Sequence, residues 1–121
     1  MNKVILCGRI TDDVKVEGKK NKYANFTLAV RDGVDEEGKN KAQFIRCAIF
    51  DKGAEVLEKF TEKGSPLCIS GRLSVSNYED DKGVMHWSTN VIVEDFDLIG
   101  AKKEEKQEKE EKKYNSRKYH R

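Results

Sequence analysis

An eight-residue segment, Gln43 to Phe50, carries the side chains best suited to binding chemistry. Its residue types are typical of a β-strand, in which successive side chains point to opposite faces. One face is apolar and is expected to pack in a core: Ile45, Cys47 and Ile49. The other face, expected to be wetter, holds Phe44, Arg46, Ala48 and Phe50. Two aromatic rings and a guanidinium on one face can stack on flat bases and neutralise phosphates, as single-stranded nucleic acid binding requires.

Two more aromatic residues are candidates for the same chemistry. Tyr78 could simply end a strand, but we expect it to bind. Trp87 shares the parity of Thr89, Val91 and Val93, which favours packing and leaves binding as the alternative. The preferred phosphate contacts flank the aromatic face: Arg46, Lys52, Lys3 and Arg72.

Catalysis and metal binding find little support in the sequence. There is no P-loop and no G-x-S-x-G motif, and no close pair of cysteines suits zinc. His86 and His120 are the only histidines, and the carboxylates fall in predicted loops or on a helix surface. We therefore expect no catalytic residue, no metal, no cofactor and no enzymatic activity.

The strands and the helix that must position these residues follow from the periodicity of the sequence. The period changes after Phe50, where Val56, Leu57 and Phe60 recur at helical spacing; Asp51 is the expected N-cap and Gly64 the expected stop. The predicted strands are Lys3–Ile10, Tyr23–Arg31, Gln43–Phe50, Leu67–Tyr78 and Val84–Ile99. Five strands with one short helix between the third and fourth predict an all-β, OB-fold barrel.

The fourth predicted strand and the loops complete this layout. The strand is expected to turn Leu67, Ile69, Gly71, Leu73 and Val75 to the core. A loop is predicted at Asp32–Lys41, and Asp80–Gly83 is predicted to be a hairpin loop. The three cysteines, Cys7, Cys47 and Cys68, are odd in number, widely spaced and set in apolar runs, so small buried fillers or strand residues are expected rather than a disulfide framework.

Composition changes abruptly after Gly100. Of the 121 residues, 38% are charged, and residues 101–121 have no aliphatic side chain after Ala101. We expect an OB-fold domain at 1–100 and a charged, disordered tail at 101–121. Residues 1–100 hold 15 Lys and Arg against 17 Asp and Glu, a net charge of −2, so any affinity for nucleic acid must come from local charge and stacking. With no membrane-length apolar run and no signal-peptide core, a cytoplasmic protein is expected.

An ordered set of segments resembles the bacterial single-stranded DNA-binding proteins of the replication type. The set covers residues 1–99: Asn2–Leu6, Gly8–Ile10, Asp12–Asp13, Ala24–Val30, Phe44–Cys47, Phe50, Lys63–Ser65, Gly71–Leu73, Tyr78, Gly83, Thr89, Val91 and Val93. The resemblance implies an OB fold that assembles as a homotetramer and wraps single-stranded DNA with little regard to sequence. It further implies stacking by Phe44, Phe50 and Tyr78. The basic positions that it matches are Lys3, Arg46, Lys52 and Lys63.

The chain departs from this family pattern in two ways. Relatives often carry tryptophan at the positions of Phe44 and Tyr78, and basic residues at those of Ser74 and Ser76, so weaker stacking and weaker electrostatics are expected. Relatives usually end in an acidic tip that docks partner proteins, whereas this sequence ends Arg117 to Arg121, so that role is not carried over.

Three functions compete at this level. The favoured one is a nucleoid-associated binder of single-stranded DNA that protects exposed strands in replication, recombination and repair. The alternative is an accessory OB-fold module that mainly binds a replication or recombination protein and binds DNA weakly. A third, more remote reading is an oligosaccharide-binding OB domain.

Overall fold

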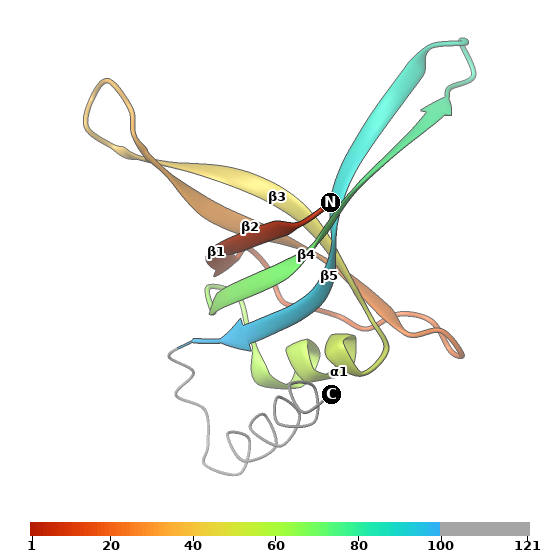
Figure 1. The fold of residues 1–121 in the computed structure, drawn as a ribbon, viewed down its shortest axis with the longest axis horizontal. Helices are drawn as coiled ribbons and strands as arrows, with labels where there is room; N and C mark the ends of the chain where they lie inside the picture. Colours follow the sequence, from red (N-terminus) through yellow and green to blue (C-terminus); the bar gives the residue numbers. More distant parts are fainter. Residues whose placement is uncertain (100–121) are drawn as a thin grey trace.

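The computed structural model describes residues 1–99, which form five strands and one helix (Figure 1). The predicted tail at 101–121 lies outside the described residues. In chain order the elements are β1 (Val4–Ile10), β2 (Tyr23–Val34), β3 (Asn40–Phe50), α1 (Asp51–Phe60), β4 (Pro66–Glu79) and β5 (Met85–Leu98). Within the described part, no helix has the length and apolar character needed to cross a membrane.

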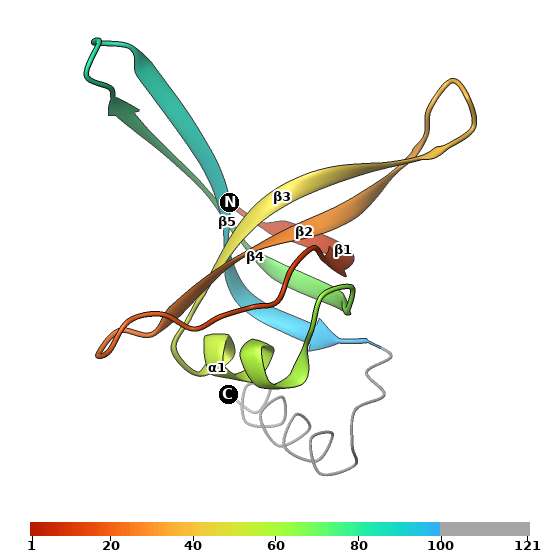
Figure 2. The same ribbon diagram turned by 180° about the vertical axis from the view of Figure 1, so that it is seen from behind.

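The five strands close into a barrel in the order β1-β2-β3-β5-β4. All neighbouring strands pair antiparallel except β3 and β5, which pair in parallel. This layout, with one helix between the third and fourth strands, confirms the predicted OB-fold class. Figures 1 and 2 show the β2–β3 and β4–β5 hairpins extending beyond the barrel as two arms, with α1 at the opposite end.

The barrel interior and the inner face of α1 form one apolar core. Leu28, Ile69 and Val91 from the strands and Leu57 from α1 are almost completely buried. Burying an aliphatic side chain of this size contributes about 1.5–3 kcal/mol. The helix predicted from the spacing of Val56, Leu57 and Phe60 is therefore confirmed, and these buried side chains close the end of the barrel.

The boundaries of α1 differ from the prediction at both ends. The helix begins at Asp51 itself, so Phe50 rather than Asp51 occupies the N-cap, and no side chain caps the first turn. Asp51 has a φ of 54°, a left-handed conformation that aspartate tolerates better than most residues. The helix ends at Phe60, well before Gly64, because Thr61 has an extended backbone with φ of −124° and ψ of 162°. The hydroxyl and the backbone N–H of Thr61 both donate to the Leu57 carbonyl of the last turn.

Strand β4 leaves the barrel halfway along its length, which overturns part of the predicted core. Its pairing with β1 stops at Gly71, and its register with β5 shifts between Ser70 and Gly71. Beyond that bulge β4 pairs only with β5, in the arm. Leu73 and Val75, predicted to be core, are therefore 42% and 57% exposed.

Two glycines allow neighbouring strands to approach closely at the ends of this pairing. A Cβ on Gly71 would lie 2.0 Å from the carbonyl oxygen of Ile92, and a Cβ on Gly8 would lie 2.2 Å from that of Ala29. Both distances are far below van der Waals contact, so any other residue would force the strands apart. Gly71 thus lets β4 lie close to β5, and Gly8 lets β1 lie close to β2.

Both arms end in the same kind of turn. Asp35 and Asp80 each use Oδ1 to accept hydrogen bonds from two backbone N–H groups of the loop that follows. Three residues after each aspartate, Gly38 and Gly83 adopt positive φ values of 82° and 79°. Aspartate and glycine in these roles are typical turn chemistry, which fixes the register of each arm from its tip.

The structure contains a disulfide that the sequence analysis rejected. Cys7 on β1 and Cys68 on β4 are direct partners in the antiparallel register, with their Cα atoms 4.0 Å apart, and their sulfur atoms are bonded. Neither is a buried filler, because both side chains lie on the outward side of the barrel. Cys47, by contrast, is free and buried, as predicted.

The Cys7–Cys68 disulfide gives the first prediction. It closes a loop with a sequence separation of 61 residues, so reducing it should lower the free energy of unfolding by about 2–4 kcal/mol. Urea unfolding with and without a dithiol reductant measures this change. A Cys7→Ser/Cys68→Ser variant should match the reduced protein and ignore reductant; equal stability of the oxidised and reduced protein would contradict the prediction.

Candidate nucleic-acid interface

The outer face of β3 has the composition predicted from alternation. Ile45, Cys47 and Ile49 point inward, whereas Phe44 is 67% and Phe50 48% exposed. Arg46 lies between the two rings on the same face and is also exposed. The inward side chains of β3 thus pack in the core, and its outward side chains form an exposed surface on which flat rings can stack.

The pairing of β2 with β3 adds small and polar side chains around these residues. In the register, Ala29 lies opposite Phe44, Thr27 opposite Arg46 and Tyr23 opposite Phe50. Cross-strand partners on one face lie about 4.5–5.5 Å apart at their Cβ atoms. The guanidinium is therefore flanked by a threonine, and Phe50 has a second aromatic residue beside it.

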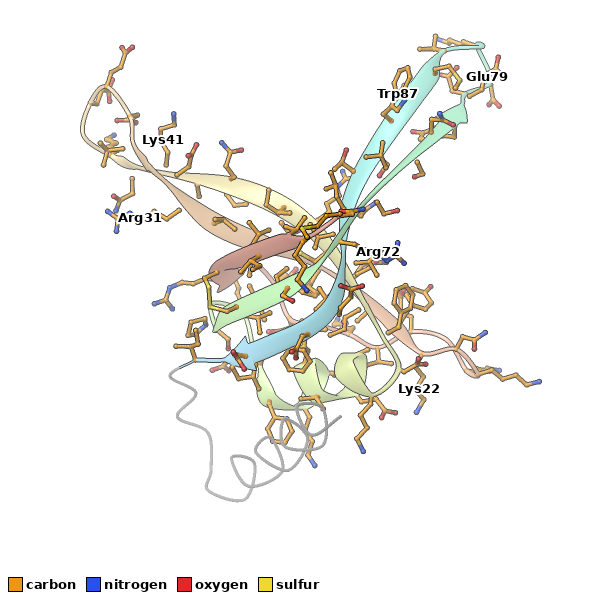
Figure 3. All side chains as sticks on the ribbon, in the orientation of Figure 1. Lys22, Arg31, Lys41, Arg72, Glu79 and Trp87 are labelled. Atoms are coloured by element: carbon orange, nitrogen blue, oxygen red, sulfur yellow. A yellow bond between two sulfur atoms is a disulfide. The ribbon has the colours of Figure 1, made fainter. Side chains whose placement is uncertain are left out.

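A groove of about 470 Å³ opens where the β4–β5 arm diverges from β3. It joins Phe44 and Arg46 to Trp87 of β5, which is 66% exposed. Figure 3 shows Trp87 on the β4–β5 arm and Arg31 and Lys41 on the other arm. The remaining lining residues are Val4, Leu6, Ile45, Leu73, Ser88, Thr89, Asn90 and Val91.

A second hollow of about 450 Å³ lies on the other side of Arg46. It is lined by Asn25, Phe26, Thr27, Arg46, Cys47 and Asn90. Arg46 and Asn90 line both hollows, so one guanidinium and one amide separate them. The arrangement gives an extended, open surface with one cation at its centre, which suits a chain-like anion better than a compact ligand.

Tyr78 does not lie next to Phe44 and Phe50 but far out on the β4–β5 arm. It is paired with His86 in the register, and β5 meets β3 only at Val91 and Ile92. Six residues separate His86 from Ile92, or roughly 20 Å of strand. It is Trp87, not Tyr78, that shares a groove with Phe44 and Arg46.

The predicted cations fall into two groups. Arg46 and Arg72 are exposed, and within residues 1–99 neither forms an ion pair with a carboxylate. Figure 3 places Arg72 at the base of the β4–β5 arm, where it is paired with Ile92. Both guanidinium groups are therefore available to an external anion.

The three lysines are less favourably placed. Lys3 Nζ lies 4.0 Å from a carboxylate oxygen of Glu94, so its charge is partly offset. Lys52 lies in the first turn of α1, two residues after Phe50. Lys63 follows the other end of α1, where its backbone N–H donates to Asp13. The helix, about 15 Å long, separates Lys63 from the aromatic face.

Ionisable groups near the site supply charge rather than catalysis. Burial raises the pKa of Cys47 to about 12, so this thiol stays protonated and unreactive at neutral pH. A hydrogen bond and the charge of Lys22 hold the pKa of Glu55 below its usual range, and the same contact raises the pKa of Lys22. Among residues 1–99 no group of three or more His, Cys, Asp or Glu side chains could hold a metal ion.

The structure adds site residues that periodicity did not single out. His86 stacks on Tyr78, and Asn90 lines both hollows beside Arg46. Tyr23 is paired with Phe50 across the strands. The signal for His86 was its distance from the turn of the β4–β5 hairpin, which sets its cross-strand partner once the turn is known. The same count fails for Tyr23, because the register of β2 with β3 shifts between Arg31 and Val34.

A comparison with protein-family models identifies the family of this chain. The model of the single-strand binding protein family matches residues 1–99, and the chain belongs to that family. These are non-enzymatic DNA-binding proteins, in line with the prediction that the chain is not an enzyme.

Individual relatives are similar over most of the chain. A single-stranded DNA-binding protein of Lactiplantibacillus plantarum is 39% identical over 86% of this chain and 54% of its own length. Single-stranded DNA-binding protein 1 of Streptococcus pyogenes is 37% identical over 82% of this chain and 78% of its own length. A single-stranded DNA-binding protein of Clostridium perfringens is 38% identical over 84% of this chain and 67% of its own length. The match thus spans only about half of the first of these proteins.

The groove between Arg46 and Trp87 can be tested without any ligand. Trp87 is the single tryptophan, and a nearby guanidinium should concentrate anions around it. Iodide should therefore quench its fluorescence more strongly than caesium does, and Arg46→Gln should bring the two quenching constants together. Lys63→Gln removes the same charge outside the groove and should leave the ratio unchanged. An Arg46→Gln protein with the original ratio would show that the two side chains are not neighbours.

Proposed function

We propose that the chain binds single-stranded DNA with little sequence preference, by aromatic stacking and phosphate contacts. The observation that carries this proposal is the outer face of β3, where two exposed rings flank an unpaired guanidinium. Base stacking on such rings tolerates any sequence, because every base has a flat face. The names of the relatives, which are single-stranded DNA-binding proteins, support the same ligand.

The site residues take separate roles in this proposal. Bases stack on Phe44, Phe50, Tyr78 and Trp87, while phosphates are held by Arg46, Arg72, Lys3, Lys52 and Lys63. The central contact is Arg46, because it lies between the two hollows and between the two rings of β3. Lys63 would be reached only by a strand that continues past α1.

The proposed cellular role is the protection of exposed DNA strands. A protein that covers bases and neutralises phosphates protects exposed strands wherever the duplex is opened, in replication, recombination and repair. We place it with the nucleoid in the cytoplasm. Disulfides are rare in reducing compartments, so Cys7 and Cys68 would be largely thiols there.

Assembly as a homotetramer is part of the proposal. Strand β1 pairs with β4 from Val4 to Arg9 but with β2 only through Arg9 and Ile10, so among the described residues the edge of Val4–Gly8 that faces away from β4 has no partner strand. Ile5 on this segment is 70% exposed. An apolar strand edge of this kind invites pairing with a second copy of the chain. Several linked binding faces would then wrap one DNA strand.

The proposed stacking of bases on Phe44 and Phe50 can be tested by substitution. Phe44→Ala and Phe50→Ala should each weaken binding of poly-dT by about 1–3 kcal/mol, because each removes one base platform. Fluorescence titration at several salt concentrations measures the affinity. Val34→Ala removes another exposed apolar side chain, at the end of β2, and should bind normally. If both phenylalanine variants bind as tightly as the original protein, the stacking assignment is wrong, and an accessory role in protein binding becomes the better proposal.

The mass in solution tests assembly. Light scattering should give four times the chain mass of 13.9 kDa. Ile5→Lys places a charge on the open β1 edge and should shift the protein to smaller species. A monomer for the unchanged protein would contradict the tetramer and remove the wrapping mechanism.

A further inference from the structure

The tip of the β4–β5 arm carries a two-ring stack that the proposed DNA site does not fully explain. Tyr78 and His86 lie opposite each other in the register, with ring centroids 5.1 Å apart and planes inclined by 18°. Tyr78 is 59% exposed and the His86 side chain 44% exposed. The imidazole therefore supports the phenol ring and still meets solvent.

Asp80 fixes the orientation of this imidazole. Its Oδ1 accepts the backbone N–H groups of Lys82 and Val84, both at 2.9 Å, and its Oδ2 lies 2.7 Å from His86 Nε2. The hydrogen bond from His86 and then that from Val84 hold the pKa of the Asp80 carboxyl below its usual value. An ionised carboxylate only accepts hydrogen bonds, so Nε2 must carry the hydrogen. The remaining ring nitrogen, Nδ1, is then the atom that gains or loses a proton.

The surface around the stack has few other positive charges. Its face of the arm consists of four cross-strand pairs: Arg72–Ile92, Ser74–Asn90, Ser76–Ser88 and Tyr78–His86. Arg72 is the permanent cation of this set, and it lies at the base of the arm, six residues from Tyr78. The charged side chains of the hairpin turn beside His86 are Glu79, Asp80, Asp81 and Lys82, with a net charge of −2. A phosphate next to Tyr78 thus meets neutral or negative groups, apart from Lys82 and a protonated His86.

We propose that His86 is a positioning residue that makes DNA binding by the β4–β5 arm dependent on protonation. It holds the Tyr78 ring for a base and, as the imidazolium, donates from Nδ1 to a phosphate oxygen. The proton comes from solvent, and no covalent bond changes. This inference rests on the proposed function, since it assigns a second role within the same DNA site.

The sign of the pH dependence follows from linkage. A bound phosphate stabilises the imidazolium, so in this proposal DNA binding is coupled to the uptake of a proton from solvent. Affinity therefore rises as the pH falls through the range in which histidines titrate, between pH 8 and 5. It levels off at both ends of that range, because the free and bound proteins then carry the same number of protons. Asp80, ionised throughout this range, keeps the ring oriented in both states.

A titration of oligo-dT at pH 8.0 and pH 5.5, at fixed salt, tests the proposal. The unchanged protein should bind roughly two- to fivefold more tightly at pH 5.5, the range expected for one exposed charge contact. The slope of log affinity against log salt should also steepen by about one contact. His86→Gln keeps a donor for Asp80 but cannot be protonated, so its affinity should not change with pH. His86→Arg should bind at both pH values as the unchanged protein does at pH 5.5.

Two controls separate this inference from the proposed function. His120→Gln removes the other histidine of the chain and should keep the full pH dependence. Phe44→Ala should weaken binding equally at both pH values. A protein that binds no oligo-dT at either pH overturns the proposed function, whereas tight binding with the same pH dependence in His86→Gln overturns only the role of His86. Circular dichroism at both pH values confirms that each variant is folded.

Discussion

A two-residue parallel pairing between β3 and β5 holds this molecule closed. Cys47 pairs with Val91 and Ala48 with Ile92, and no other register partners join these strands. This contact on one side, and β1 between β2 and β4 on the other, join the antiparallel β2–β3 and β4–β5 hairpins into one barrel. The pairing of β3 with β5 also places Asn90 beside Arg46, since the residues preceding the pairing run alongside each other in parallel strands. The same pairing thus closes the core and brings the groove residues together. A slip of one residue in β3 would turn its core side chains to solvent and its exposed side chains to the core.

The shortness of that pairing explains the shape of the rest. Beyond it each hairpin is free to diverge, so the arms form and the groove with Phe44, Arg46 and Trp87 opens between one arm and the barrel. An arm with solvent on both faces cannot bury an apolar side chain fully, which is why Leu73 and Val75 are exposed. The same freedom carries Tyr78 away from Phe50. The Tyr78–His86 pair therefore lies apart from Phe44 and Phe50, whereas Trp87, nearer the barrel, shares a groove with Phe44.

Period-two alternation was enough to predict the Phe44–Phe50 part of β3, because one face there is partly or fully buried, whereas the residues from Asn40 to Gln43 are exposed on both faces. It failed on β4, where the strand changes its environment at the bulge after Ser70, and alternation contains no information about where a strand leaves a barrel. The disulfide was missed for a related reason. Cys7 and Cys68 are 61 residues apart in sequence and become partners only through the antiparallel register of β1 and β4. Element types depend on local sequence, but cross-strand partners depend on topology and register.

Positive charge is scarce along the β4–β5 arm, and it is outnumbered by negative charge in residues 1–100. Residues 1–100 carry a net charge of −2, and along the outer face of the β4–β5 arm only Arg72 is permanently positive. A polyanion is then not drawn to the domain by its overall field, so each unpaired guanidinium has to act at short range. In the proposed function, stacking, which salt does not screen, would then supply much of the affinity. On such a surface a single titrating imidazole changes the local charge by a large fraction, whereas on a strongly basic surface it would hardly be noticed. Because Ser74 and Ser76 carry no charge, the proposed protonation of His86 would add a positive charge to a face of the arm that otherwise holds only Arg72.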